Sequence, residues 1–259
     1  MGIFEEIAQA KEKGRSVCLC MVVETDGAVP RHTGSKMLVY ADGSMSGTVG
    51  GGEVEQQVYQ VAQEALKDGQ PRLLSYTLDA RQEEAVGVCG GSMKVYIEPI
   101  NQPAKVVVIG AGHVGKSVAR LAKHLNFRVL VSDERAELCN HTLIPEADGF
   151  YPVKLQDLPD QIEIDANTFL VLVTHSAEVE IAGLPRLLET NPAYIGVIGS
   201  LNRGAHTRKA LLDAGVSEEK IRKIKSPIGV DIHAETPDEI AVSILAEIIE
   251  VKNHLKYSR

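Results

Sequence analysis

A glycine-rich segment that follows an apolar run carries the clearest chemical signal in the sequence. Residues 106–115 read Val-Val-Val-Ile-Gly-Ala-Gly-His-Val-Gly, so a buried strand leads into a glycine turn and a helix that begins near His113. In this pattern Gly110 makes the tight turn, Gly112 lets the backbone approach a pyrophosphate and Gly115 lets the helix pack closely on the strand. Because a helix N-terminus attracts phosphate, the segment predicts a dinucleotide-type site. A glycine turn without a ligand is the alternative.

An acid stands where a dinucleotide site needs one. Asp133 follows the apolar run Val129–Val131. It lies roughly twenty residues after the glycines, the distance at which an acid takes a ribose hydroxyl. Arg135 comes soon after, and an arginine suits a 2′-phosphate instead. The sequence therefore predicts a nucleotide contact at both residues and leaves the choice between NAD and NADP open.

A second glycine cluster lies in the first hundred residues. Gly50, Gly51 and Gly52 run directly into a segment with helical spacing that contains Glu53 and Glu55. Exposed amides at the start of a helix form an anion site. Because the two acids oppose a bare phosphate, we expect a ligand that carries hydrogen-bond donors as well as charge. A flexible loop that caps the helix is the alternative.

One thiol has glycines around it. Cys89 precedes Gly90 and Gly91, so its sulfur has small neighbours and nearby amides that favour a thiolate. We interpret Cys89 as a functional thiol, although a lone cysteine is usually a small buried hydrophobic residue. Cys18 and Cys20 are two residues apart in a predicted strand and therefore share one of its faces, and we expect both in the core.

Two further segments are expected at the carboxyl edge of a parallel sheet, where ligands of such folds bind. The apolar strand at 194–198 is followed at once by Gly199 and Ser200, and Arg203 comes in the first turn of the next helix. This arrangement suits a phosphate. His175 follows the preceding strand, and three roles remain open for it: a ligand contact, an acid–base group or an ordinary loop histidine.

The composition excludes several classes of protein. The chain has 259 residues, of which 44% are hydrophobic, and its formal net charge is −8. This acidic balance argues against a general nucleic-acid binder and against an anionic membrane surface as partner. No apolar run approaches the ~20 residues that a membrane span needs, and the first residues lack the pattern of a signal peptide. We therefore expect a cytoplasmic protein whose cysteines are free thiols.

The apolar runs divide the chain into two domains of an α/β protein. Asn101–Pro103 interrupts the pattern, which places a smaller N-terminal α+β domain at 1–102 and a Rossmann-type domain, with a doubly wound parallel sheet, at 103–259. In the first domain we expect strands at 17–23, 37–40, 72–78 and 92–97 and helices near 3–7 and 53–67. In the second we expect strands at 105–109, 128–132, 169–173 and 194–198 and a final helix from Pro237 to about Leu255, with Thr236 as its N-cap.

Taken together, these segments resemble the XdhC/CoxI family, accessory proteins for the maturation of xanthine and carbon monoxide dehydrogenases. The resemblance covers nearly the whole chain and is specific, because many separate motifs occur in the right order. The matching segments are residues 22–25, 30–31, 34–37, 50–55, 87–91, 110–115, 133–135, 194–200, 227–232 and 234–244.

The resemblance implies a protein that binds molybdenum cofactor, supports its sulfuration and delivers it to an apo molybdenum hydroxylase. It implies a cofactor-handling chaperone rather than an enzyme, with a cysteine desulfurase as a further partner and a homodimer as its assembly. In such a protein the glycine amides would hold the molybdopterin phosphate, Glu53 or Glu55 would accept pterin N–H groups, and Cys89 would approach molybdenum or carry sulfur. An NAD(P)-dependent oxidoreductase and a nucleotide-sensing interaction protein are the alternatives.

The sequence departs from the family pattern at three places. His233 stands where many members have glycine. Ser176 and Ala177 stand where many have Asp and His, which puts in doubt an acid–base or metal role for His175. Some relatives have a cysteine where Glu53 stands, which leaves Cys89 as the glycine-flanked thiol.

Overall fold

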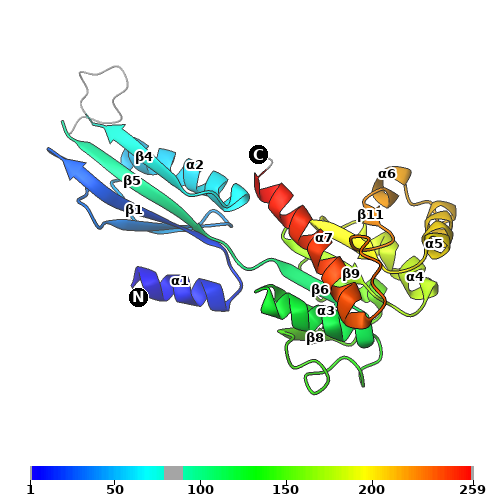
Figure 1. Ribbon diagram of the computed structural model, residues 1–259. Coiled ribbons are helices and arrows are strands. Elements are labelled where there is room, and N and C mark those ends of the chain that lie inside the picture. Colours follow the sequence, from blue (N-terminus) through cyan, green and yellow to red (C-terminus); the bar gives the residue numbers. More distant parts are fainter. Residues whose placement is uncertain (1, 79–89, 258–259) are drawn as a thin grey trace. The chain divides into compact units, whose positions relative to one another are not determined.

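The computed structural model describes residues 2–78 and 90–257, which form two compact units (Figure 1). The first unit is Met1–Gln102 and the second is Pro103–Ser258. Each unit has its own sheet and its own hydrophobic core.

The first unit is built on a five-stranded antiparallel sheet with the strand order β3-β2-β1-β5-β4. Its strands are β1 (Val17–Asp26), β2 (Lys36–Tyr40), β3 (Met45–Gly47), β4 (Arg72–Thr77) and β5 (Ser92–Ile100). Its helices are α1 (Ile3–Glu12) and α2 (Gly52–Asp68). The apolar side of α2 packs on one face of this sheet with Val54, Val58, Ala62 and Ala65, which gives the helical spacing seen in the sequence.

The core beneath α2 contains the first two cysteines. Cys18 and Cys20 lie on one face of β1 and are fully buried, so their predicted place in the core is confirmed. The hydrogen bond with Cys18, together with burial, raises the pKa of the Cys20 thiol. A buried thiol that stays protonated is a poor nucleophile. Both residues therefore contribute to packing.

The second unit is built on a six-stranded parallel sheet with the strand order β11-β10-β9-β6-β7-β8. Its strands are β6 (Lys105–Ile109), β7 (Arg128–Ser132), β8 (Gly149–Tyr151), β9 (Thr168–Leu172), β10 (Tyr194–Val197) and β11 (Ile224–Lys225). When these six strands are numbered 1 to 6 in chain order, the sheet has the 3-2-1-4-5-6 strand order of a Rossmann fold. The central strands are buried on both faces, which explains their continuous apolar runs.

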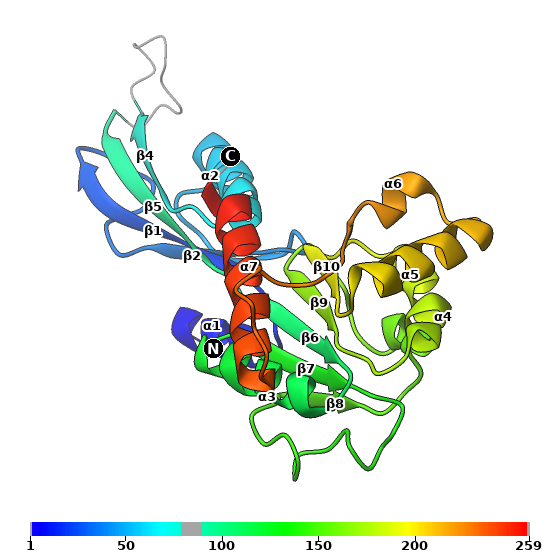
Figure 2. The same cartoon turned by 45° about the vertical axis from the view of Figure 1, so that its right-hand side comes forward.

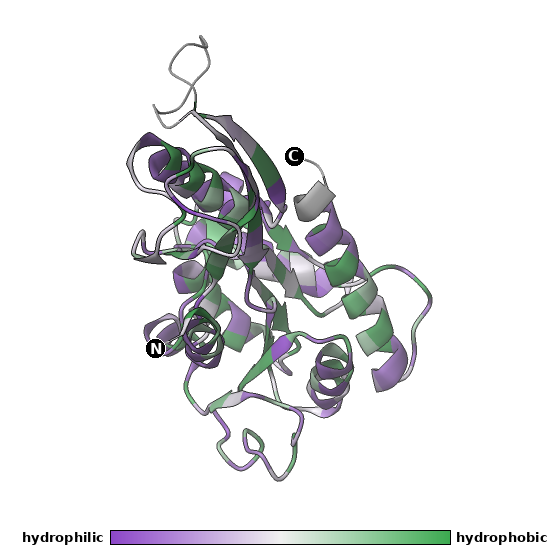
Figure 3. Ribbon diagram, turned by 90° about the vertical axis from the view of Figure 1, so that its left-hand side faces the viewer, coloured by the Kyte–Doolittle hydropathy of each residue, from purple (hydrophilic) through white to green (hydrophobic). Residues whose placement is uncertain are grey.

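Helices cover both faces of the parallel sheet (Figures 1 and 2). On one face lie α3 (His113–His124) and α7 (Pro237–Tyr257), and on the other lie the 3₁₀ helix η1 (Leu155–Asp160), α4 (Ala177–Leu187), α5 (Leu201–Asp213) and α6 (Glu218–Ile221). Along the long helices, hydrophobic residues are interspersed with hydrophilic ones, as in helices with one buried side (Figure 3). The predicted doubly wound α/β fold is confirmed.

The expected start of the final helix is also confirmed. The Thr236 hydroxyl accepts a hydrogen bond from the Glu239 N–H at 3.3 Å, and the Glu239 carboxylate accepts one from the Thr236 N–H at 3.0 Å. This reciprocal pair is a capping box, and Pro237 occupies the first helical position.

Three short strands are missing from the sequence-based expectation. They are β3, β8 and β11, and each has too few residues to show a period of two. In addition, β1 continues to Asp26, beyond its expected end at Val23. After a bulge between Val22 and Glu24, this polar end pairs with β5 alone. A paired strand end that faces solvent needs no apolar residues, so the sequence gives little sign of it.

His233, where the family pattern often has glycine, has a left-handed backbone with φ of 55°. We expect His233→Gly to raise the free energy of unfolding by up to about 1 kcal/mol, because relief of left-handed strain exceeds the extra chain entropy that glycine loses. Thermal unfolding measures this effect. The control is Ile232→Gly, at an exposed neighbour without a positive φ, which should lower stability. An equal loss in both variants would contradict the strain at His233.

Candidate functional site

The carboxyl ends of four neighbouring strands bring predicted site residues to one edge of the second sheet. The residues that follow β6, β7, β9 and β10 at this edge include Gly110, Asp133, Thr174 and Gly199. Between β6 and β9 the strand order reverses, and ligands of open α/β sheets bind outside such a switch point. This edge of the sheet is therefore the candidate site.

The three glycines of the turn after β6 have different structural roles. Gly110 has φ of 110°, and a Cβ there would lie 2.6 Å from the Val173 carbonyl oxygen. A Cβ on Gly115 would lie 1.9 Å from the Gly110 carbonyl oxygen, because α3 packs directly on the turn. A Cβ on Gly112 would meet no atom within 4 Å. The fold thus requires the first and third glycines, whereas the space at Gly112 is open to a ligand.

The N-terminus of α3 is open as well. Gly112 is its N-cap, no side-chain hydrogen bond caps it, and its first turn contains no acid. His113, the first helical residue, is exposed. Amides at a helix N-terminus have no partner within the helix and attract anions. The start of α3 has the properties of a phosphate-binding element.

Asp133 lies at the end of β7 and is held by four hydrogen bonds. Its Oδ2 accepts from the Ala111 N–H at 2.8 Å and from Arg135 Nη2 at 2.7 Å. Its Oδ1 accepts from the Arg135 N–H at 3.0 Å and from Arg135 Nε at 2.9 Å. Burial alone would raise the pKa of Asp133, but the Arg135 and Ala111 hydrogen bonds outweigh burial and hold it below its usual value. The carboxylate is therefore ionised and fully engaged by the protein.

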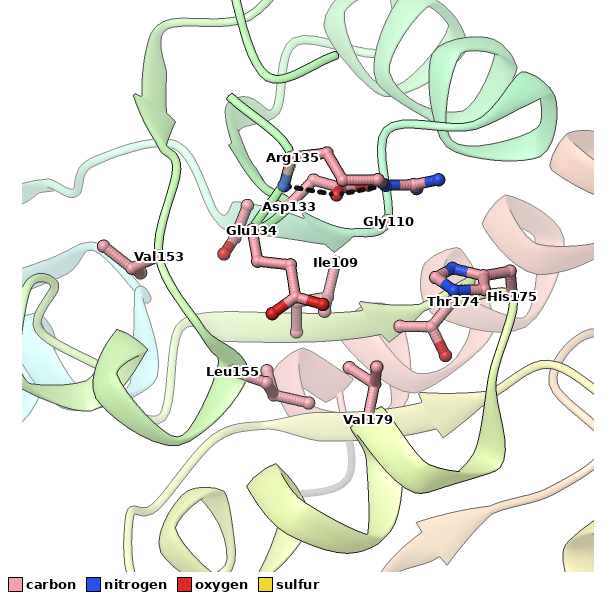
Figure 4. Close-up of a pocket in the computed structure, with 11 residues that line it drawn as sticks. Ile109, Gly110, Asp133, Glu134, Arg135, Val153, Leu155, Thr174, His175 and Val179 are labelled. Carbon is pink, nitrogen blue, oxygen red and sulfur yellow. Dashed lines mark hydrogen bonds and ion pairs between the residues drawn. The ribbon is translucent and has the colours of Figure 1, made fainter. Parts of the chain in front are cut away.

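The glycine turn and Asp133 form one side of an open cleft (Figure 4). The apolar residues that line it are Ile109, Val153, Leu155 and Val179. Its charged and polar lining includes Glu134, Arg135 and His175. In Figure 4 the Glu134 carboxylate points into the cleft above Leu155, while the Arg135 side chain extends over the turn at Gly110. The cleft combines an apolar base with charged groups at its rim.

A buried ion pair stands beside this cleft. Glu180 on α4 is fully buried, and its Oε1 accepts from Thr174 Oγ1 at 2.8 Å and from Arg203 Nη2 at 2.5 Å. Arg203 Nη2 also donates to the Thr174 carbonyl oxygen at 3.2 Å. Burial raises the pKa of Glu180, and the hydrogen bonds from Thr174 and Arg203 offset this only in part. The pair fixes the chain after β9 to the start of α5.

The predicted phosphate cluster after β10 is thus partly used by the fold. Ser200 caps α5, since its hydroxyl accepts the Arg203 N–H at 3.3 Å. A Cβ on Gly199 would lie 2.8 Å from Cδ of Arg203, so glycine makes room for that side chain. Glu180 was not among the predicted site residues. A signal was present, because Glu180 shares its helix face with the buried residues Leu184 and Leu187.

In the first unit, the glycine loop before α2 carries its own anion. Gly50, Gly51 and Gly52 all have positive φ, which explains the triplet. Glu55 Oε2 accepts from the Gly51 N–H at 3.2 Å, from the Val49 N–H at 3.3 Å and from the Thr48 hydroxyl. A carboxylate of the chain therefore sits where the sequence suggested a ligand anion.

Cys89 lies outside the described residues, whereas its glycine neighbours lie within them. The Leu78 N–H donates to the Gly91 carbonyl oxygen, and the Gly90 N–H donates to the Leu78 carbonyl oxygen, both at 2.8 Å. A Cβ on Gly91 would lie 2.3 Å from the Ala28 carbonyl oxygen, so only glycine fits there. Gly90 has φ of 80°. Both glycines have structural roles at the base of β5.

His175 is exposed at the rim of the cleft, and no described side chain forms a hydrogen bond with it.

Within 2–78 and 90–257, no three His, Cys, Asp or Glu side chains gather closely enough to hold a metal ion. No helix in the described ranges is long and apolar enough to cross a bilayer. Cys139 is buried and donates its Sγ–H to the Val131 carbonyl oxygen at 3.4 Å.

The family follows from matches to both units. Residues 106–248 match the model of the XdhC Rossmann domain, and residues 10–77 match the XdhC and CoxI family model. The chain belongs to the XdhC and CoxI family. The predicted family resemblance is confirmed.

The chain is similar to two curated relatives and to one solved structure. The chain is 36% identical to the uncharacterized protein YqeB of Escherichia coli over 98% of its own length and 47% of that protein. It spans about half the length of that relative. It is 25% identical to the molybdenum cofactor insertion chaperone PaoD of Escherichia coli over 95% of this chain and 86% of PaoD. A structure described as a xanthine dehydrogenase from Bacillus halodurans shares the fold, with a TM-score of 0.54 and 20% identity over 100% of this chain and 98% of that one.

Proposed function

We propose that this member of the XdhC and CoxI family binds molybdenum cofactor as cargo and delivers it to an apo molybdenum hydroxylase of the xanthine dehydrogenase type. The likeness to PaoD, over 95% of this chain and 86% of that chaperone, carries the proposal. The family match over residues 106–248 supports it.

The cleft of the second unit offers what such a cargo needs. Molybdopterin carries a phosphate and a flat pterin with several N–H donors. The open N-terminus of α3, with Gly112 beside it, suits the phosphate. The apolar base of the cleft suits a flat ring, and the carboxylate of Glu134 suits N–H donors. A carrier needs only to bind and release its cargo.

The finer parts of the proposal concern sulfur and partners. Cys89 contacts molybdenum or carries sulfur during sulfuration, a cysteine desulfurase supplies that sulfur, and the protein acts in the cytoplasm as a homodimer. The thiols of Cys18, Cys20 and Cys139 are buried, which leaves Cys89 as the candidate for exchange with a partner.

An NAD(P)-dependent oxidoreductase has weaker support. In that reading Asp133 accepts a ribose hydroxyl, but Arg135 and Ala111 already use its oxygens. His175, the candidate acid–base group, lacks a hydrogen-bonded partner among the described side chains. No observation favours a nucleotide-sensing protein over a carrier.

We expect protein purified from a molybdenum-replete host to contain molybdenum and pterin and to activate an apo-hydroxylase. Cys89→Ser should lower that activation at least about tenfold, because a hydroxyl is a far weaker ligand than thiolate for a soft metal. Cys139→Ala is the matched control and should retain activation, since that thiol is buried. Mass spectrometry, metal analysis and hydroxylase turnover measure the outcome. Full activation by Cys89→Ser would exclude the thiol role, and purified protein that neither carries nor transfers molybdenum would exclude the carrier.

A further inference from the structure

Asp133 has no acceptor capacity left for a ligand. A carboxylate has about four lone-pair positions, and four donors, one from Ala111 and three from Arg135, already approach Asp133. Its side chain is only 5% exposed. To bind Asp133, the two hydroxyl groups of a ribose would have to displace the charged, bidentate contact that Arg135 makes with it. Neutral hydroxyl groups form weaker hydrogen bonds to a carboxylate than a guanidinium does. The acid expected to recognise the ligand is therefore occupied.

The next residue has the free carboxylate. Glu134 is exposed, lines the cleft and accepts no hydrogen bond from the described residues. Its carboxylate points into the cleft, and Leu155 is drawn below it in the view of Figure 4. Ile109, Val153, Leu155 and Val179 are the apolar side chains that line the same cleft. A flat ring packed against these side chains would present its edge to Glu134.

We infer that Glu134, rather than Asp133, is the carboxylate that recognises the ligand in this cleft, and that it selects a ring with two adjacent hydrogen-bond donors. The 2-amino-4-oxo edge of a pterin is such a ring edge, because its ring N–H and its amino group point the same way. Two carboxylate oxygens accept that pair in parallel, as they do the two donors of a guanidinium. This inference rests on the proposed function, since it names the part of the cargo that the cleft holds.

The same geometry disfavours adenine. On each edge of adenine a ring nitrogen acceptor stands beside the amino donor. A carboxylate facing that edge gains one hydrogen bond and sets its second oxygen against a lone pair.

The test is a titration of the full chain with three probes: pterin, lumazine and NADH. Lumazine carries an oxo group in place of the 2-amino group of pterin, so it lacks the adjacent donor pair. Fluorescence and calorimetry should give pterin at least about tenfold tighter binding than lumazine, the size expected for a hydrogen bond to a charged group. Glu134→Gln should remove that preference, because an amide offers one acceptor and one donor. Glu137→Gln, which neutralises an exposed acid outside the cleft lining, should keep it.

The outcomes separate this inference from the proposed function. Unchanged pterin affinity in Glu134→Gln, equal affinity for pterin and lumazine, tighter binding of NADH than of pterin, or no pterin binding would each overturn the role of Glu134. Hydroxylase activation by the same wild-type protein tests the carrier function separately. A wild-type protein that activates the hydroxylase but fails the probe test would retain the function and lose the inference.

Discussion

Replacement of Gly115 by alanine is expected to destabilise the second unit by about 3 kcal/mol or more, which corresponds to a fall of about 6–12 °C in its melting temperature. The added Cβ would lie 1.9 Å from the Gly110 carbonyl oxygen and 3.3 Å from Cγ1 of Val108. The turn cannot move away easily, because the Gly110 N–H donates to the Ser132 carbonyl oxygen at 2.8 Å. Either α3 must shift away from β6 or the turn must break.

Gly112→Ala is the matched control, three residues earlier in the same segment. Its Cβ would enter open space, and the backbone at Gly112 has φ of −74°, which alanine adopts readily. We expect this variant to lose less than about 1 kcal/mol, the usual range for an N-cap change. Scanning calorimetry of both variants checks the pair. A melting temperature for Gly115→Ala equal to that of the control would mean that α3 does not pack on the turn as closely as described.

The fold of the second unit could be predicted because its signals are local. Buried parallel strands produce continuous apolar runs such as Val106–Ile109, and the glycine turn fixes where the next helix begins. The short strands β8 and β11 could not be predicted in the same way. Their place depends on pairing with β7 and β10, which lie elsewhere in the chain, and not on a pattern of their own.

The candidate site could be located from the sequence, but not its internal bonding. The position of Asp133 after a buried strand is a local feature, and the structure places it beside the glycine turn as that feature requires. Whether a carboxylate is free depends on the side chains around it. Arg135 turns back onto Asp133, and Glu55 turns back onto the Gly51 amide, so both acids have partners from their own segment. Sequence spacing gives the neighbours but not the rotamers that decide this.

The long-range partner of Glu180 lies still further from sequence reasoning. Arg203 is on a different helix, and a strand and two loops separate the two residues along the chain. Helical spacing predicts that Glu180 faces the core, and a buried acid requires a partner. Many basic residues could fill that role, and only the packing of α4 against α5 selects Arg203.

Arg203→Leu is expected to lower the free energy of unfolding by about 3–5 kcal/mol, because it leaves the carboxylate of Glu180 buried without its cation. The Glu180 side chain has no exposed surface, whereas 25% of the Arg203 side chain is exposed. The charge that loses its partner is therefore the one that water cannot reach. Arg208→Leu is the matched control on the same helix. That arginine pairs with Glu218 in solvent, with exposed fractions of 42% and 56%, and its loss should cost less than about 1 kcal/mol.

The pH dependence distinguishes a buried charge from lost packing. The folded-state pKa of Glu180 is raised by burial, and loss of Arg203 raises it further. Below the unfolded-state pKa of about 4.3, Glu180 is protonated in both states and carries no charge penalty. Between the unfolded-state pKa and the raised folded-state pKa, the carboxyl is ionised in the unfolded state alone, so stability falls as the pH rises across this window. The loss of stability in Arg203→Leu, relative to the wild type, should therefore be largest near neutral pH and smaller in acid. The double variant Glu180→Gln/Arg203→Leu should recover much of this stability at neutral pH. Urea unfolding at several pH values measures both effects, and a deficit that does not change with pH would assign the role of Arg203 to packing.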